Sequence, residues 1–273
     1  MTSQAHFDLT LFTDDPGLAA AADLAGVDRI GVDLEILGKE CRQGELQNWI
    51  SHHKAEDLLP LRSVIGNARL FARCNPMHAD SQREIEQLLD LGVEVLMLPY
   101  FQTLDEAVRF IRFVDERAYP VLLVETAEAA GMVQDLCRLD GVEEIHFGLN
   151  DLRLSLGWPS HFHVLVSDML RDKCAQVLEA GVRLGVGGVG RVGDNDLPIP
   201  ADLVSARIVN LGASASLISR VFFRQPFPGC LSDEVGKLRA WLRFCAEADQ
   251  AWHQAMFERL IRALAWPSGS RRH

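Results

Sequence analysis

Short apolar stretches alternate with longer stretches of helical period along most of this chain. The apolar stretches, which predict buried strands, cover residues 7–12, 29–34, 70–74, 93–98, 120–124, 144–147, 183–186 and 207–211. Between them, residues 81–91, 104–114 and 126–139 carry apolar side chains at i, i+3, i+4 and i+7, as amphipathic helices do. Strands that alternate with helices in this way predict a parallel sheet with right-handed crossovers.

The spacing of the predicted strands favours a closed barrel over an open sheet. Four successive strands begin near residues 70, 94, 120 and 144. The same helix-to-strand joint, a glycine followed by a valine, recurs at Gly26, Gly92, Gly141 and Gly181. Eight such units predict an α/β fold, a (β/α)₈ TIM barrel, and 273 residues suit one barrel of about 250 residues. We expect a single domain over residues 1–273, with the barrel over about 5–225.

A long helix is expected after the barrel. Residues 226–229 break the chain, and residues 231–266 then have a helical period, with Ser232 as the expected N-cap. This helix carries two apolar stripes, one of which contains Trp241 and Phe244. Because a helix with two apolar faces needs two partners, we expect one stripe on the barrel and the other against a neighbouring subunit of a homo-oligomer.

Composition and charge exclude several classes of partner. The net charge of −11 argues against a nucleic-acid surface, which needs a basic face. No uncharged apolar run approaches the roughly 18 residues that cross a bilayer, and the first residues lack a signal-peptide pattern. Six widely separated cysteines are typical of free thiols in a reducing compartment. We therefore expect a cytoplasmic protein with no membrane or nucleic-acid partner.

Charged residues follow several predicted strands, at the end where barrel enzymes have their active sites. Asp33 and Glu35 lie at the end of the second predicted strand and Arg73 at the end of the third. Glu125 follows the fifth predicted strand and Asp151 follows the sixth. Each acidic residue alone could be a helix cap or a loop residue. Together, four carboxylates would repel one another without a bound cation, and oxygen ligands without Cys or His pairs favour Mg²⁺ or Mn²⁺.

The glycine-rich segment at residues 185–190 matches the spacing G-x-G-x-x-G, but no helix is predicted after it. Without a helix N-terminus the pattern does not predict a dinucleotide site. Gly187 and Gly188 are instead expected to let the backbone approach a ligand closely. Serines near the predicted eighth strand could contact a substrate carboxylate or simply pack against the barrel; these are Ser214, Ser216 and Ser219.

The motifs around these residues resemble one known family. Arg73 in "FARCNP", Pro99 in "VLMLPYFQT", Glu125 in "VLLVETAEAA" and Asp151 in "HFGLNDLRLSLG" are similar to the motif series of the HpcH/HpaI aldolase / citrate lyase β-subunit family. The segment "GVDRIGVDLE" resembles the second strand of that family, and the resemblance extends from about residue 24 to 220.

This resemblance implies a divalent-metal-dependent lyase of the class II aldolase type, acting through an enolate of a small 2-oxo acid such as pyruvate or oxaloacetate. Glu125 and Asp151 would hold Mg²⁺ or Mn²⁺, and Arg73 would donate to the carbonyl oxygen that becomes negatively charged. The substrate carboxylate would be bound by backbone around Gly148, Leu149 and Asn150. The resemblance also implies a homo-oligomer, such as a hexamer.

One residue that differs from the motif of the aldolase branch leaves the type of reaction undecided. The aldolase branch of the family has a histidine where this chain has Ile36. His52 and His53 could supply the base from another direction, or they could be surface histidines, while Asp33 and Glu35 could order water or the second substrate. The alternatives are a citrate lyase-like or malyl-CoA lyase-like enzyme that acts on a thioester, and a catalytically silent ligand-binding barrel.

Overall fold

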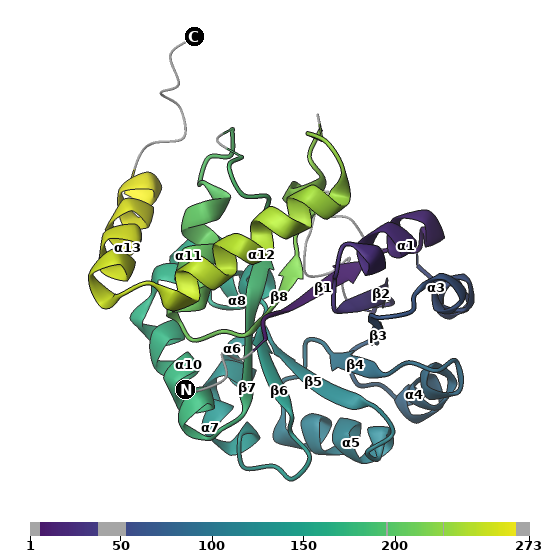
Figure 1. Ribbon diagram of the computed structural model, residues 1–273. Helices are drawn as coiled ribbons and strands as arrows, with labels where there is room; N and C mark the ends of the chain where they lie inside the picture. The colour runs from purple at the N-terminus through teal and green to yellow at the C-terminus, as the bar shows by residue number, and fades with distance from the viewer. Residues whose placement is uncertain (1–5, 38–52, 195, 226, 266–273) are drawn as a thin grey trace.

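The computed structural model describes residues 6–37, 53–194, 196–225 and 227–265. Within them, eight parallel strands close into a barrel in chain order (Figure 1). The strands are β1 (Asp8–Phe12), β2 (Arg29–Asp33), β3 (Arg69–Arg73), β4 (Val95–Leu98), β5 (Tyr119–Val124), β6 (Glu144–Phe147), β7 (Arg183–Val189) and β8 (Ala215–Ile218). The predicted TIM barrel is confirmed.

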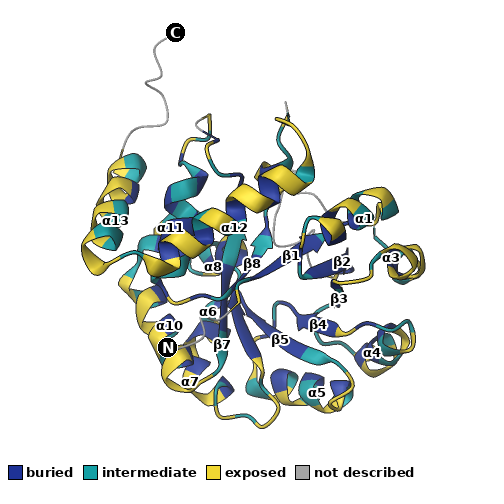
Figure 2. Ribbon diagram, in the orientation of Figure 1, coloured by how far each residue is buried: buried dark blue, intermediate teal, exposed yellow. Residues whose placement is uncertain are grey.

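Helices surround the barrel and leave their polar sides outside. They are α1 (Pro16–Leu24), α3 (Leu58–Val64), α4 (Ser81–Asp90), α5 (Leu104–Val114), α6 (Ala127–Gly131), α7 (Val133–Leu136), α8 (Leu149–Ser155), α9 (His161–Val166), α10 (Asp168–Glu179), α11 (Ala201–Asn210), α12 (Leu231–Glu247) and α13 (Gln250–Ala265), with 3₁₀ turns η1 (Ala55–Asp57) and η2 (Arg220–Phe223). Figure 2 shows the strands buried and the outer sides of the helices exposed. None of the described helices is both long and apolar enough to cross a membrane.

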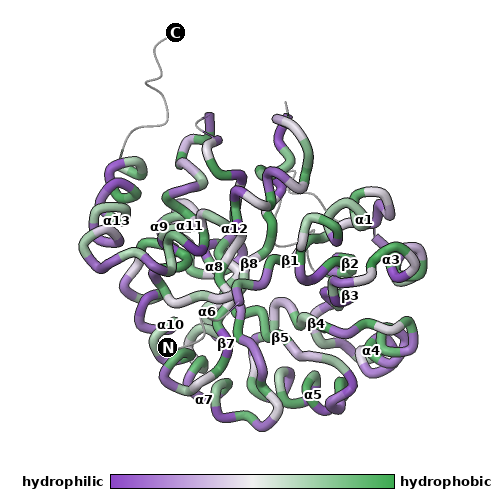
Figure 3. Tube along the Cα trace, in the orientation of Figure 1, coloured by the Kyte–Doolittle hydropathy of each residue, from purple (hydrophilic) through white to green (hydrophobic). Residues whose placement is uncertain are grey.

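The strands are buried on both faces, as the near-continuous apolar runs predict. Along β4, Val95 and Met97 belong to a small cluster with Phe71 and Val121, whereas Leu96 and Leu98 belong to the large core shared with the helices. Figure 3 shows hydrophobic positions along the strands and hydrophilic positions on the outer turns of helices such as α4. The inward-facing cluster fills the barrel, so the site must lie above it.

The glycine joints are present as predicted. Gly26, Gly92, Gly141 and Gly181 have φ angles of 84°, 85°, 82° and 74°, in the left-handed region that ends a helix. Gly212, with φ of 86°, makes the same joint before β8.

The predicted eighth strand, residues 207–211, was wrong. Those residues end α11, and β8 is Ala215–Ile218 instead. The β-branched pair Ile208 and Val209 favoured a strand locally, but in the fold both positions belong to the helix that packs beside β7. β8 is only four residues long and begins with the small residues Ala215 and Ser216, which give little strand signal.

Because β8 lies at Ala215–Ile218, the three serines Ser214, Ser216 and Ser219 do not all follow the strand as the sequence predicted. Ser216 lies within the strand and its hydroxyl donates to the carbonyl of Val186 at 2.9 Å. Ser214 precedes the strand, and its carbonyl accepts from the N–H of Asp8 at the opposite end of the barrel. Ser219 alone of the three follows the strand and lines the pocket described below.

Two predicted helices are divided. Residues 126–139 form the two short helices α6 and α7, and the expected helix over 231–266 is α12 followed by α13. Ala248 has extended backbone (φ −67°, ψ 150°), and the Asp249 carboxylate accepts from the N–H of Trp252 at 2.8 Å, which starts the second helix. The N-cap of α12 is Cys230 rather than Ser232.

The break lets α13 fold back onto α11 (Figure 1). The guanidinium of Arg207 lies over the ring of Phe257 at 4.4 Å, and the indole N–H of Trp241 donates to Ser205 at 2.9 Å. Part of the second apolar stripe therefore packs within the chain, while Phe244 on the same stripe remains 49% exposed.

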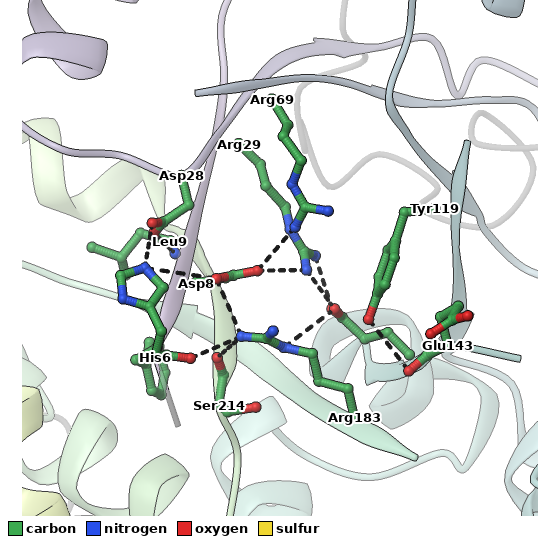
Figure 4. Close-up of polar contacts among 12 residues, drawn as sticks. His6, Asp8, Leu9, Asp28, Arg29, Arg69, Tyr119, Glu143, Arg183 and Ser214 are labelled. Atoms are coloured by element: carbon green, nitrogen blue, oxygen red, sulfur yellow. Dashed lines mark hydrogen bonds and ion pairs between the residues drawn. The ribbon is translucent and has the colours of Figure 1, made fainter. Parts of the chain in front are cut away.

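Ion pairs close the N-terminal end of the barrel (Figure 4). The buried Arg29 donates to Asp8 at 2.7 Å and to both carboxylate oxygens of Glu144 at 3.0 and 2.6 Å. Arg69 and Arg183 also reach Asp8, at 3.3 and 3.2 Å. Burial would raise the pKa of Glu144, but hydrogen bonding and the nearby positive charge lower it to about 2. This end of the barrel is thus a closed ionic layer.

Candidate active site

A pocket of about 530 Å³ lies at the carboxyl ends of the strands, where the sequence predicted the site. Its lining includes Arg73 at the end of β3, Glu125 after β5 and Asp151 in the first turn of α8. Residues distant in sequence therefore meet at the mouth of the barrel, because parallel strands end on the same side.

Three carboxylates lie close together here, two of which, Glu125 and Asp151, line the pocket. Glu35, Glu125 and Asp151 each place an oxygen within 4.8 Å of the other two. All three residues are buried, with relative exposures of 0%, 3% and 7%. The sequence predicted Glu125 and Asp151 as the metal pair, whereas Glu35 was expected to order water or substrate; the geometry places it in the same cluster.

Arg73 connects this cluster to Asp33. Its Nε and Nη2 donate to the two carboxylate oxygens of Asp33 at 2.8 and 2.7 Å, and Nη2 lies 3.2 Å from Glu35. Burial disfavours the charged guanidinium, but the carboxylates of Asp33, Glu35 and Glu125 outweigh it and raise the pKa of Arg73. Arg73 is therefore a fixed cation beside the carboxylates.

The local backbone positions the Glu125 side chain. The N–H of Tyr100 donates to its Oε1 at 3.0 Å, from a residue with a left-handed φ of 47°. A Cβ added at Gly148 would lie 2.7 Å from Oε2, closer than real contacts allow. A glycine at this position is therefore required by the carboxylate beside it.

The donor set fits a hard divalent cation. Three buried carboxylates within reach of one another, with the single positive charge of Arg73 beside them, leave excess negative charge that is costly in a partly dry pocket. Oxygen-only ligands are those that Mg²⁺ and Mn²⁺ prefer.

The backbone predicted to bind substrate lines the same pocket, through Gly148, Leu149, Asn150, Gly187 and Gly188. The N–H of Gly148 donates to the carbonyl of Val124 at 3.0 Å, so this amide is already engaged within the barrel. The first-turn amides of α8, at Leu149 and Asn150, remain the candidates, since such amides lack partners within their own helix.

A bulge in β7 brings the glycine pair to the pocket. The register with β8 shifts between Gly185 and Gly188, and Gly187 has a φ of 50°. A Cβ at Gly187 would lie 2.8 Å from the side chain of Leu149. Close packing, together with the left-handed backbone, explains the glycine at this position.

Of the two histidines proposed as a base, His52 lies outside the described residues. The Nδ1 of His53 accepts from the N–H of Asp33 at 3.0 Å, and its Nε2 lies 3.7 Å from Asp14. His53 is thus beside the end of β2 and is not among the residues that line the described pocket. Ile36, in the place of the family histidine, is 48% exposed.

Two other histidines line the pocket, and the sequence analysis missed both. His146, on β6, donates through its Nε2–H to the carbonyl of Gly187 at 3.1 Å. The alternation of β6, in which positions 144 and 146 share one face, could have placed it inside the barrel. Burial, and secondarily the charge of Arg153, lowers the pKa of His161 at the start of α9. No local pattern distinguished His161 from a surface residue.

The curated proteins that the chain resembles include several aldolases. No protein-family profile matches the chain. The chain is 27% identical over 177 residues to a 4-hydroxy-2-oxovalerate aldolase of Rhodococcus jostii (strain RHA1), which covers 51% of this chain and 67% of that protein.

Solved structures share its fold at low sequence identity. A crystal structure of an HpcH/HpaI aldolase/citrate lyase family protein from Burkholderia cenocepacia J2315 matches with a TM-score of 0.63 and 17% identity, over 90% of this chain and 95% of the other. A citrate lyase β subunit from M. tuberculosis, complexed with oxaloacetate and magnesium, matches with a TM-score of 0.59 and 20% identity, over 88% and 98%.

The barrel and the curated aldolase relative agree with the motif series around Arg73, Glu125 and Asp151, and confirm the resemblance of this chain to the HpcH/HpaI aldolase and citrate lyase family.

Proposed function

We propose that this protein is a divalent-metal-dependent aldolase-type carbon–carbon lyase that acts through the enolate of a small 2-oxo acid such as pyruvate or oxaloacetate. The observation that carries the proposal is the buried cluster of Glu35, Glu125 and Asp151 beside Arg73, at a pocket that Arg73, Glu125 and Asp151 line. The names of the relatives support the same class of substrate.

Glu125 and Asp151 would hold Mg²⁺ or Mn²⁺, with Glu35 as a third carboxylate of the cluster. A bound divalent cation would act as a Lewis acid that polarises the carbonyl of the oxo acid. The first-turn amides of α8, next to Asp151, would bind the substrate carboxylate, since helix N-termini favour anions.

Arg73 would stabilise the enolate. Loss of a proton from the carbon next to the carbonyl leaves negative charge on the carbonyl oxygen, and a guanidinium held in place stabilises that charge without reorganisation. Its bidentate contact with Asp33 fixes the plane of the guanidinium. In this arrangement Asp33 orients Arg73.

His161 would exchange the proton with the substrate carbon. It lines the pocket, and its lowered pKa keeps the imidazole neutral near pH 7, as a general base requires. His53 is the weaker candidate because its Nδ1 already accepts from Asp33.

Exchange of the methyl protons of pyruvate with deuterium tests this proposal without an acceptor. We expect exchange, followed by NMR, that requires Mg²⁺ and stops after chelation. Glu125→Gln and Asp151→Asn should each abolish Mn²⁺ binding in titration calorimetry while the fold is retained. Glu128→Gln, an exposed glutamate on α6, is the matched control. Unchanged Mn²⁺ affinity in both pocket variants would rule out this metal site.

A further inference from the structure

The pocket is much larger than a three-carbon oxo acid requires. Its volume of about 530 Å³ falls in the range of about 300–1,000 Å³ that encloses ligands of drug size. Pyruvate beside the carboxylate cluster would leave most of this space unfilled. An aldolase needs a second reactant next to the enolate carbon, so the remaining volume is where that reactant would lie.

Most side chains that line the remaining volume are apolar. Beyond the carboxylate cluster, on the side of β6 to β8, the lining comes from α9, α11, η2 and the segment after β7. We call this part the apolar lobe; its apolar side chains are Phe162, Leu165, Leu197, Ile199, Val204 and Val221, and the polar residues His161, Ser219 and Arg220 line the same side of the pocket. Hydroxyl groups placed here would lose their hydrogen bonds to water, whereas a hydrocarbon chain would gain from leaving water.

Ion pairs and hydrogen bonds join two of the segments that form the walls of the lobe. Asp194, in the segment after β7, accepts from Arg191 at 3.3 Å and from Arg224 at 2.9 Å. Arg191 also donates to the carbonyls of Phe222 and Arg224, at 3.2 and 3.1 Å. These contacts tie the segment that carries Ile199 to the turn that carries Val221. The lobe is therefore part of the folded structure.

We propose that the apolar lobe binds the hydrocarbon chain of the acceptor, so that the second substrate is an aldehyde with a linear or aromatic hydrocarbon group. This inference rests on the proposed function. The new bond joins the methyl carbon of pyruvate, after it loses a proton, to the carbonyl carbon of the aldehyde. The aldehyde oxygen takes up a proton, and the product is a 4-hydroxy-2-oxo acid; cleavage is the reverse.

A series of aldehydes with pyruvate and Mg²⁺ tests the inference. From propanal to hexanal, kcat/KM should rise about fourfold for each methylene until the lobe is filled. Glycolaldehyde, which carries a hydroxyl, should react least well. A flat series, or a CoA thioester that reacts with higher kcat/KM than any aldehyde, would overturn the inference.

A charge placed in the lobe should remove this selectivity. In Val221→Asp, the ratio of kcat/KM for hexanal to that for glycolaldehyde should fall at least about tenfold. The matched control is Val108→Asp on α5, because Val108 and Val221 are 42% and 41% exposed. Val204→Asn provides a second, neutral change in the lobe. Equal ratios in the lobe variants and the control would also overturn the inference.

The two proposals can fail separately. Deuterium exchange into pyruvate by the unmodified protein depends only on the carboxylate cluster, Arg73 and the base. Exchange with a flat aldehyde series would leave the proposed function standing and remove only the lobe assignment, whereas absence of exchange would overturn both.

Discussion

The contact between Gly148 and Glu125 allows a test of the site that removes no charge. In Gly148→Ala, the new methyl carbon would lie 2.7 Å from Oε2 and 2.9 Å from Cβ of Glu125, about 0.7 Å short of an ordinary contact of 3.4 Å. The backbone at Gly148 (φ −85°, ψ 96°) is open to alanine, so the strain comes from the contacts with Glu125, and relief of the contact with its Cβ also needs a small shift of the main chain. Glu125 must therefore move away from its partners.

The magnitude follows from this displacement. A misplacement of about 1 Å in a catalytic constellation can cost about 100-fold in rate, so a shift of about 0.7 Å should cost at least about tenfold. We expect this loss both in Mn²⁺ affinity, measured by titration calorimetry, and in the rate of pyruvate deuteration. The free energy of unfolding should fall by no more than about 3 kcal/mol, as for other overpacked sites.

Gly131→Ala on α6 is the matched control, because an added Cβ there meets nothing within 4 Å. If Gly148→Ala binds Mn²⁺ and deuterates pyruvate as the unmodified protein does, Glu125 is either not held against Gly148 or not a ligand. The reasoning from the close contact would then be wrong.

Three substitutions and one measurement of molecular mass test other parts of the structure. Arg73→Lys keeps the charge but loses the forked donor, and pyruvate deuteration should slow at least about 100-fold; a near-normal rate would make Arg73 a structural ion-pair residue. Arg153→Gln removes a charge that lowers the pKa of His161, so the acid limb of the pH–rate profile should move to higher pH, and an unmoved limb would count against His161 as the base. Because the folded pKa of Glu144 is lowered from 4.5 to about 2, its contribution to stability is present above pH 4.5 and lost as the pH falls. The difference in unfolding free energy between the unmodified protein and Glu144→Gln, measured by urea titration, should therefore shrink by about 3 kcal/mol from pH 5 toward pH 2. A difference that stays constant with pH would contradict this. Finally, the 49% exposure of Phe244 leads us to expect a homo-oligomer in light scattering, which a monodisperse monomer would disprove.

The sequence predicted the strands whose signals were both local and repeated. Gly92 and Gly141 end helices with a backbone angle that favours glycine, so these helix-to-strand joints could be recognised from the sequence alone. The carboxylates Glu125 and Asp151 could be picked out for a similar reason, because each lies where the sequence changes from a strand pattern to a helix pattern.

The features that the sequence did not predict depend on contacts between distant segments. Ile208 and Val209 favour a strand by themselves, but in the fold they belong to α11. Ala215 and Ser216 have little strand preference, and they lie in β8 because β1 and β7 pair with that strand on its two sides. The break at Ala248 depends on one capping aspartate, Asp249. His161 reaches the pocket only because α8 and α9 follow β6 in that geometry.

The position of His146 has a practical consequence for protein engineering. Its Nε2 lies at the pocket, 3.1 Å from the Gly187 carbonyl, while its Nδ1 lies 3.8 Å from Glu144 in the ionic layer at the other end of the barrel. Opposite it in the sheet is Gly185, where an added Cβ would lie 2.2 Å from Nδ1. A mutant library aimed at new acceptors cannot therefore randomise His146 by itself. Positions 144, 146 and 185 have to be varied together, or kept, if selected variants are to remain thermally stable while their substrate range changes.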